Sequence, residues 1–285
     1  MSKIIQRLVI FFAGLPALIA LVIFLPAYNH LCLNIAVIIF AVLGGLEFQN
    51  ILMQKKMYLP LAEAAVLGGL APCLATAAIS FGFSRLGCCA VIMAAVSWLL
   101  LSGIFSAKDN RDAFIGKTAA GFSVLFYPGI FLSWIVAMSA LRESGFLIVG
   151  FFLMVFLNDS AAWAFGMLFG NGNRGLIRVS PNKSIAGFAG GILASILIGI
   201  AGIHFYPQIP DARFFSFPVS GFVLGFCTGI AATMGDLCES VLKRSAGIKD
   251  SGFLIPGRGG ILDSVDSAAM AAPVFYLTFR LLFVS

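Results

Sequence analysis

Long runs of apolar residues recur along the whole chain, and each run is about as long as a membrane-spanning helix. A helix needs roughly 20 apolar residues to cross the hydrocarbon core of a bilayer, somewhat more when it is tilted. The pattern predicts about nine such helices, at residues 8–28, 31–52, 60–82, 86–106, 116–140, 145–169, 185–206, 214–234 and 265–284. No separate hydrophilic domain interrupts them, so we expect an all-α, polytopic transmembrane fold.

Composition and charge support a membrane protein and indicate its orientation. Of the 285 residues, 60% are hydrophobic and 11% are charged, which leaves too little charge to cover a soluble protein. With alternating crossings, 14 of the 18 Lys and Arg residues fall on one side of the membrane. Since cytoplasmic loops are enriched in these residues, we expect a multi-pass protein of the cell inner (plasma) membrane, with the N-terminus and the 235–264 loop in the cytoplasm. The same distribution accounts for the net charge of +6 without a nucleic-acid partner.

Residues that carry chemistry are concentrated in the second half of the chain. Residues 1–144 are expected to form a chemically quiet helical scaffold, and residues 145–285 to carry the catalytic region. The exception is Glu47, which lies inside a predicted span, where a charged side chain costs about 2.5–3.5 kcal/mol; packing and functional roles are both open. Glycines at four-residue spacing, such as Gly221 and Gly225, indicate close helix packing, either within the chain or in a homodimer.

Polar residues fall on one face of the segment Gly235–Arg244 if that segment is helical. At 3.6 residues per turn, Asp236, Ser240 and Lys243 align, and Arg244 stands one turn beyond Ser240. Mg²⁺ prefers oxygen ligands, and fixed cations bind phosphate oxygens. This face therefore predicts a site for a metal ion and a phosphate group at the membrane edge.

A glycine-rich segment at 256–260 precedes two further carboxylates. Asp263 and Asp266 are three residues apart, so they share a face at the start of the last predicted helix. Glycine backbone and a helix N-terminus together favour an anion. With Asp236, the two aspartates supply three carboxylates, enough for one or two Mg²⁺ ions completed by substrate phosphates.

Two earlier segments add candidate residues. Asn158 and Asp159 lie inside the sixth predicted span, where an ionisable residue indicates function by default. The segment Ser180–Ser184 brings hydroxyl groups and the cation of Lys183 beside a predicted helix start. Taken alone, Ser184 is expected to cap that helix.

Together these motifs resemble the phosphatidate cytidylyltransferase (CDP-diacylglycerol synthase) family. Resemblance covers the second half of the chain closely and the first half in outline. The motifs that carry it are Asn158-Asp159-Ser160-Ala161-Ala162-Trp163, Ser180-Pro181-Asn182-Lys183-Ser184, Ser240-x-x-Lys243-Arg244, Lys249-Asp250 and Pro256-Gly257-x-Gly259-Gly260-x-x-Asp263-x-x-Asp266.

The resemblance implies a reaction and roles for these residues. CTP and phosphatidic acid in the bilayer would give CDP-diacylglycerol and pyrophosphate, for phospholipid biosynthesis, with Mg²⁺ held by Asp236, Asp263 and Asp266 and room for a second metal ion. The implied catalytic residues are Asp236, Ser240, Lys243, Arg244, Asp263 and Asp266. The implied substrate- and phosphate-binding residues are Asn158, Asp159, Ser180, Lys183, Lys249, Gly257, Gly259 and Gly260.

The chain departs from the family pattern at three positions. Arg258 stands where His is usual, Ser264 where Arg is usual, and Ala186 where an acidic residue is common. Since the carboxylates and the Lys-Arg pair remain, we expect metal and phosphate binding to persist, with a changed rate, nucleotide preference or lipid preference.

Two other functions stay open at this point. One is a related CTP-dependent transferase that acts on another lipid phosphate or on a polyprenol. The other belongs to a different class, an ion-coupled transporter that uses Glu47 and Asp159 within the membrane. Most of the acidic residues cluster at one face rather than at the bilayer midplane, which favours the transferase.

Overall fold

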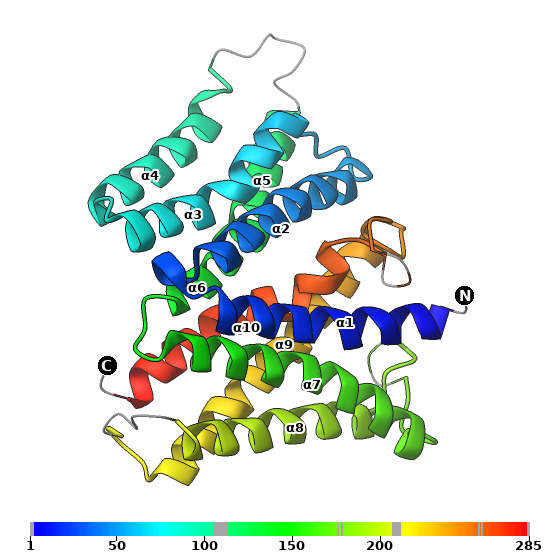
Figure 1. The fold of residues 1–285 in the computed structure, drawn as a ribbon. Helices are drawn as coiled ribbons and strands as arrows, with labels where there is room; N and C mark the ends of the chain where they lie inside the picture. The colour runs from blue at the N-terminus through cyan, green and yellow to red at the C-terminus, as the bar shows by residue number, and fades with distance from the viewer. Residues whose placement is uncertain are drawn as a thin grey trace. The chain divides into compact units, whose positions relative to one another are not determined.

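The computed structural model describes residues 3–104, 113–175, 177, 179–206, 212–255, 257 and 259–283, with side chains from residue 13 onward. Within these ranges the chain forms helices, and its only β-type pairings are isolated bridges (Figure 1). In chain order the helices are α1 (Lys3–Phe24), α2 (Ala27–Met53), α3 (Leu61–Phe81), α4 (Arg85–Leu101), α5 (Phe114–Val124), the π-helical turn η2 (Leu125–Ile130), α6 (Phe131–Met138), α7 (Ser144–Phe169), α8 (Ile185–His204), α9 (Phe217–Ser245) and α10 (Leu262–Leu282). The expected all-α fold is confirmed.

Seven helical segments of the described chain are long and apolar enough to cross a membrane. They are α2, α3, the continuous α5–η2–α6 segment, α7, α8, α9 and α10. The Ala13–Phe24 part of α1 and the 17-residue α4 are shorter apolar stretches. Large apolar side chains such as Leu86 and Ile115 are about four-fifths exposed, as expected for a surface that faces lipid. The chain is a multi-pass membrane protein; a helix occupies each predicted span, but the number nine is not confirmed.

The last two helices differ from the prediction in ways that matter for the site. The predicted span at 214–234 continues as one helix to Ser245, and α10 begins at Leu262 rather than at residue 265. The predicted spans were bounded by hydropathy and therefore stopped at the first charged residues. The helices themselves continue through these residues, because backbone hydrogen bonding does not depend on side-chain polarity. Asp236 and Lys243 therefore stand on α9, and Asp263 and Asp266 on α10.

The described chain forms two compact units. The first comprises Met1–Leu8, Leu25–Ala137 and Leu242–Val265, and the second comprises Val9–Phe24, Met138–Val241 and Asp266–Ser285. Both units take segments from either side of residue 144. The prediction that residues 145–285 carry the catalytic residues is about function and not about compact units, so it stays a prediction.

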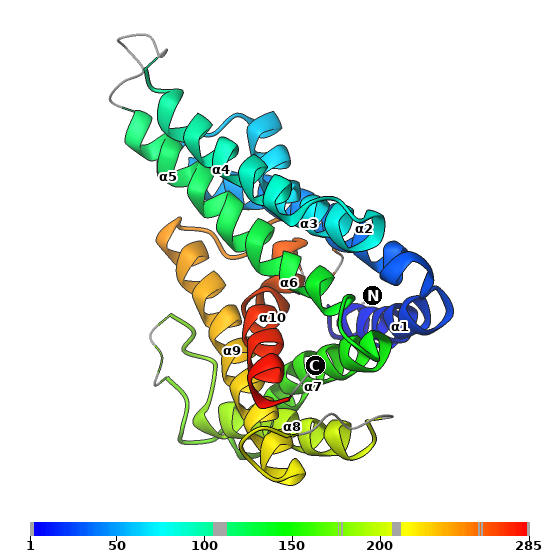
Figure 2. The same cartoon turned by 90° about the vertical axis from the view of Figure 1, so that its left-hand side faces the viewer.

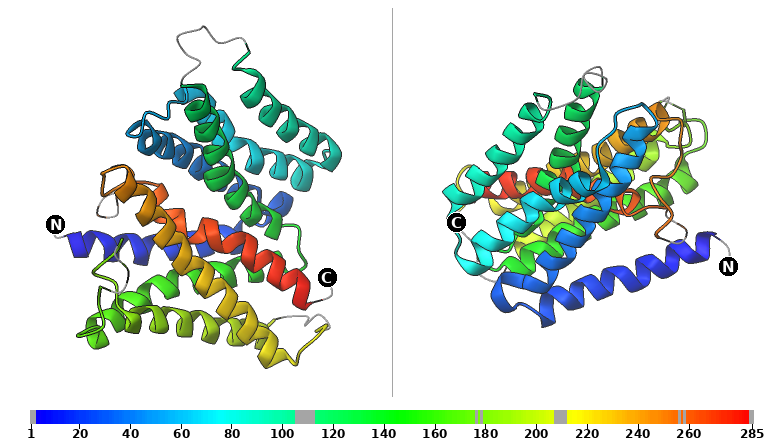
Figure 3. Two further views of the ribbon diagram at one scale, coloured as in Figure 1. Left: turned by 180° about the vertical axis from the view of Figure 1, so that it is seen from behind. Right: turned by 90° about the horizontal axis from the view of Figure 1, so that it is seen from above.

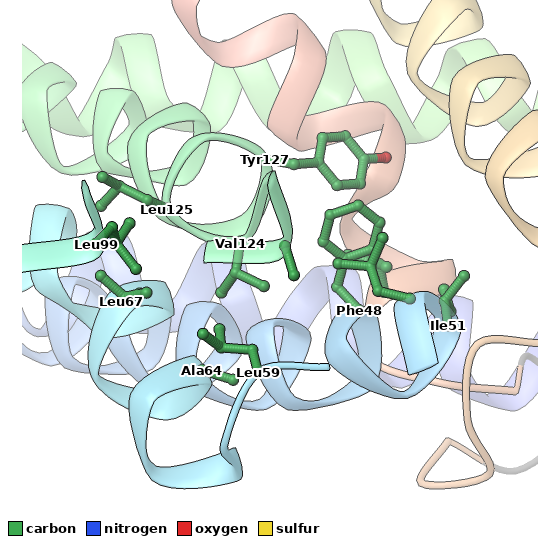
Figure 4. Close-up of a cluster of buried hydrophobic side chains, with 12 residues drawn as sticks. Phe48, Ile51, Leu59, Ala64, Leu67, Leu99, Val124, Leu125 and Tyr127 are labelled. Carbon is green, nitrogen blue, oxygen red and sulfur yellow. The ribbon is translucent and has the colours of Figure 1, made fainter. Parts of the chain in front are cut away.

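In the first unit, helices α2, α3 and α5 lie side by side (Figure 2). They and η2 enclose an apolar cluster (Figure 4). Phe48 of α2 and Tyr127 of η2 lie side by side in this cluster, with ring centroids 5.4 Å apart. Leu262, the first residue of α10, is fully buried in the same cluster. Apolar packing thus fixes the start of α10 against α2.

The second unit contains α7, packed along α8, and the greater part of α9 and α10 (Figures 1 and 3). Close approach between α8 and α9 depends on small residues: a Cβ on Gly221 would lie 2.7 Å from Ile200 Cα, and one on Gly225 would collide with the backbone at Ser195. The four-residue glycine spacing therefore serves packing within the chain. A homodimer stays a prediction.

Candidate active site

The predicted site residues fall into two groups, one in each compact unit. The first group contains Lys243, Asp263 and the loop between α9 and α10. The second contains Asp159, Lys183, Asp236 and Asp266. Asp263 and Asp266 share a helix, as predicted, yet their surroundings differ.

In the first group, Asp263 joins three segments of the chain. Its Oδ1 pairs with the ammonium group of Lys243, near the end of α9. Its Oδ2 accepts hydrogen bonds from the backbone N–H of Ser251 at 2.9 Å, the hydroxyl of Ser251 at 2.9 Å and the N–H of Gly260 at 2.7 Å. Both carboxylate oxygens are therefore engaged, and they fix the α9–α10 loop to the start of α10.

Glu47 joins the same group, although it is more than 200 residues away in sequence. Its carboxylate, on α2, accepts hydrogen bonds from the backbone N–H groups of Ile261 and Leu262 and from the hydroxyl of Ser251. Only 5% of Glu47 is exposed. Its position inside an apolar span marked it in the sequence as unusual, but nothing there revealed its partners.

Glycine is required at positions 259 and 260, before α10, because the carboxylates of Asp263 and Glu47 leave no room for a Cβ there. Gly259 has a φ of +113°, and a Cβ there would lie 2.6 Å from Asp263 Oδ2. A Cβ on Gly260 would collide with Glu47 Oε2 and with Ser251 Oγ. The N–H of Gly259 is bonded to the carbonyl of Ile255 at 2.9 Å, and that of Gly260 to Asp263. Binding of substrate phosphate by these glycines stays a prediction.

The second group is centred on an ion pair between Lys183 and Asp236. Lys183 comes from the turn before α8, where Ser184 caps the helix by accepting from Gly187 N–H at 3.0 Å, as expected. Asp236 stands on α9. About a quarter of the Lys183 side chain and over a third of that of Asp236 are exposed, so solvent or a substrate can reach both.

Asp266 lies among other acids in the second unit. It is 6% exposed and interacts electrostatically with Glu239, Asp236 and Asp159. Its Oδ1 accepts from the backbone N–H of Ser267 at 2.7 Å, and the hydroxyl of Ser267 donates to Asp159 at 3.4 Å. Clustered carboxylates repel one another unless a cation or a proton neutralises them. Glu239 was not among the predicted site residues, because a single acid one turn from Asp236 carries no distinctive pattern.

Of the three aspartates predicted to bind Mg²⁺, two are suited to it in this structure. Within the described ranges, no three His, Cys, Asp or Glu side chains are grouped closely enough to hold a metal ion by themselves. Mg²⁺, however, is usually bound through one or two carboxylates, with substrate phosphates and water completing its shell. Asp236 and Asp266 suit that mode, whereas both oxygens of Asp263 are already engaged.

Asn158 has structural hydrogen bonds in this conformation. Its amide nitrogen donates to Ser195 Oγ at 3.1 Å and to the Gly229 carbonyl at 3.2 Å, and its Oδ1 accepts from Thr233 at 3.3 Å. The residue is 1% exposed. It therefore joins α7, α8 and α9.

The remaining predicted residues lie around these two groups. Arg244 is exposed and contacts the Ile248 carbonyl at 3.5 Å, and Lys249 is exposed. Ser180 and Ser240 are half-buried, and Gly257 has a φ of +79°. Of the three departures from the family pattern, Ser264 bonds back to the Gly260 carbonyl at 3.3 Å, Ala186 lies in the first turn of α8, and Arg258 lies outside the described residues.

A multi-pass helical protein in which two lysine–aspartate pairs accompany a carboxylate cluster has the features of a membrane enzyme that handles phosphate groups. The chain belongs to the cytidylyltransferase family, whose family model matches residues 5–282.

Three relatives extend this result. The chain is 33% identical to a phosphatidate cytidylyltransferase of Staphylococcus haemolyticus over 91% of its own length and 95% of that protein. It is 37% identical to one of Haemophilus influenzae, over 65% and 66% of the two chains. A shorter match to one of Synechocystis, at 40% identity, covers 44% of this chain and 40% of the relative. The resemblance found in the motifs is thereby confirmed over nearly the whole chain.

Proposed function

We propose that this chain transfers a cytidylyl group from CTP to phosphatidic acid, which yields CDP-diacylglycerol and pyrophosphate for phospholipid biosynthesis. The observation that carries the proposal is the family match over residues 5–282, together with relatives named phosphatidate cytidylyltransferase that align with 91% of the chain. The paired lysines and clustered carboxylates supply the charges that this reaction requires.

The reaction balances without a dedicated base. An oxygen of the lipid phosphate forms a bond to the α-phosphorus of CTP, and the bond from that phosphorus to the oxygen bridging to the β-phosphate breaks. Pyrophosphate leaves with that electron pair. Since the attacking phosphate is already anionic near neutral pH, catalysis consists mainly of placing the two phosphates in line and neutralising their charge.

We assign phosphate binding to one lysine in each unit. Lys183 and Lys243 are paired with Asp236 and Asp263, and a pairing carboxylate keeps each ammonium group oriented before substrate arrives. A phosphate oxygen can then take a second N–H of the same ammonium group, which has three. Exposed Arg244 and Lys249 are suited to the outer phosphates of the nucleotide.

Asp236 and Asp266 are the residues we assign to Mg²⁺, with Asp159 close by. Bound there, the ion would offset the negative charge that two phosphates bring together. The carboxylates of this unit would otherwise repel an incoming triphosphate, so a cation is needed for substrate binding as well as for turnover.

The membrane setting suits the proposed lipid substrate. Phosphatidic acid presents its phosphate at the headgroup layer, where basic residues attract anionic lipid. We propose that the site opens to the cytoplasmic side of the inner membrane, because most of the Lys and Arg residues fall on the side of the 235–264 loop and CTP is a cytoplasmic nucleotide.

Purified protein in lipid nanodiscs tests the substrate assignment. Pyrophosphate release is measured with each nucleoside triphosphate and with phosphatidic acid, a polyprenol or a polyprenyl phosphate as acceptor. We expect release only with a cytidine nucleotide and phosphatidic acid. Release that depends on a polyprenol or its phosphate instead would identify a related transferase with another lipid substrate.

A further inference from the structure

We propose that Glu47 is a positioning residue for cytidylyl transfer: it holds the α9–α10 loop and the first turn of α10 in the conformation that presents Asp263 and Lys243. The inference rests on the proposed function for its catalytic consequence. Its structural part concerns only contacts within the first compact unit.

Two backbone hydrogen bonds and one hydroxyl contact, shared with Asp263, connect Glu47 to the segment it holds. Oε1 accepts from Ile261 N–H at 3.0 Å, and Oε2 accepts from Leu262 N–H at 2.9 Å. The Ser251 hydroxyl lies 3.1 Å from Oε2. One side chain of α2 thus bonds to both ends of the segment 251–262.

A carboxylate is well matched to this position. The first N–H groups of a helix have no partner within the helix and carry partial positive charge. Two of them, at Ile261 and Leu262, receive one carboxylate oxygen each. These bonds compensate for burying Glu47, and they explain why an acid is retained inside an apolar span.

Ser251 connects Glu47 to Asp263. Its hydroxyl lies 3.1 Å from Glu47 Oε2 and 2.9 Å from Asp263 Oδ2, and its backbone N–H also donates to Asp263. A hydroxyl has a single proton, so it donates to one carboxylate at a time. The position of Glu47 therefore affects the hydrogen bonding of the carboxylate that pairs with Lys243.

The neighbouring backbone is shaped around Glu47. A Cβ on Gly252 or on Gly260 would collide with its carboxylate. On the apolar side, Phe48 and Leu262 are buried in one cluster, so the residues next to Glu47 and its partners are also packed together. The loop is thus held against one turn of α2 by the Glu47 carboxylate and by the apolar contact of Phe48. The two glycines leave room for that carboxylate.

The experiment compares Glu47→Gln with a matched control, Glu63→Gln. Glu63 lies on the adjacent helix α3, where it pairs with Lys117 and is more exposed. Each protein is assayed with CTP and phosphatidic acid, and hydrogen–deuterium exchange is followed in peptides covering 249–265. Since a misplacement of about 1 Å costs on the order of 100-fold in rate, we expect kcat to fall by about that factor in Glu47→Gln. The KM for phosphatidic acid should change little, and the exchange increase should be confined to 249–265.

The control should stay within about threefold of the wild type, as expected for a partly exposed ion pair. Ser251→Ala keeps both carboxylates and should show the same local increase in exchange with a smaller loss of kcat, which decides the question if Glu47→Gln does not fold. Unchanged exchange in 249–265, or an increase spread evenly over all helices, would overturn the positioning role. A wild-type protein that is inactive with CTP and phosphatidic acid would instead count against the proposed function, while the exchange comparison still tests the contacts.

Discussion

The ammonium group of Lys243 on α9 is paired with the carboxylate of Asp263 at the start of α10, and the two side chains are only 12% and 7% exposed. Since the other oxygen of Asp263 binds the loop, this pair links a candidate phosphate-binding cation to the segment between the two helices. Asp263 thus both pairs with Lys243 and binds the loop, and the ammonium group of Lys243 neutralises the charge of its carboxylate.

A double-mutant cycle tests this pair. Lys243→Met leaves Asp263 unpaired in a largely buried position, and losing one partner of such a pair costs on the order of 3 kcal/mol. Adding Asp263→Asn removes the uncompensated charge, so the double variant should unfold at a higher temperature than Lys243→Met alone. Both single variants, Lys243→Met and Asp263→Asn, and the double variant should lose CTP-dependent turnover. Purely additive losses of thermal stability would show that the two groups do not interact.

The pair in the second unit should separate metal binding from phosphate binding. Asp236→Asn is expected to raise the Mg²⁺ concentration needed for half-maximal turnover, because a metal ligand loses its charge. Lys183→Gln is expected to raise the KM for CTP by about tenfold or more and to leave the Mg²⁺ requirement nearly unchanged.

Lys117→Gln is the matched control for these two variants. Lys117 belongs to a pair of similar exposure, 28% for each partner, outside the candidate site. Its effect on both constants should be small. An Mg²⁺ requirement that is the same in wild type and Asp236→Asn would remove Asp236 from the metal assignment.

Gly260→Ala should inactivate the protein without unfolding it. The added methyl group would collide with Glu47 and Ser251, so the start of α10 must shift. Gly87→Ala is the control, because its nearest neighbour would be Ser84 Cβ at 3.7 Å, an ordinary contact. Turnover and thermal unfolding are measured for both variants. Full activity in Gly260→Ala would contradict the close fit between the loop and Glu47.

Asn158→Ala should act through stability rather than through substrate affinity. It removes the hydrogen bonds of the buried amide to Ser195, Gly229 and Thr233, and each lost hydrogen bond costs about 0.5–1.5 kcal/mol. The melting temperature should fall, while the KM for CTP of the folded protein stays close to that of the wild type. A raised KM at unchanged melting temperature would instead support direct contact with substrate.

The sequence predicted the helical class and the approximate position of each helix, because the length of an apolar run reflects bilayer thickness. It also predicted that Asp236 and Lys243 stand on one helix. It could not show that they pair with Lys183 and with Asp263, in different compact units. Helical periodicity defines a face, but it does not specify which other segment covers that face.

Glu47 shows the same limit more strongly. Its polarity inside an apolar run was visible, yet its partners are backbone N–H groups 214 and 215 residues away. Backbone partners leave no trace in residue type, so no motif could reveal them. The glycines at 259 and 260 were noticed for their freedom to bind an anion; in the structure the N–H of Gly260 binds Asp263, and a Cβ at either position would collide with a carboxylate of the protein.

Cytidylyl transfer is tested by following the phosphorus atoms of CTP. Purified protein with Mg²⁺ and phosphatidic acid is given CTP labelled either at the α- or at the γ-phosphate, and lipid and aqueous products are counted separately. We expect the α label to enter the lipid, in equal amount to the pyrophosphate released, and the γ label to stay in the aqueous pyrophosphate. Transfer of the γ label to lipid, or no label in lipid from either nucleotide, would contradict cytidylyl transfer.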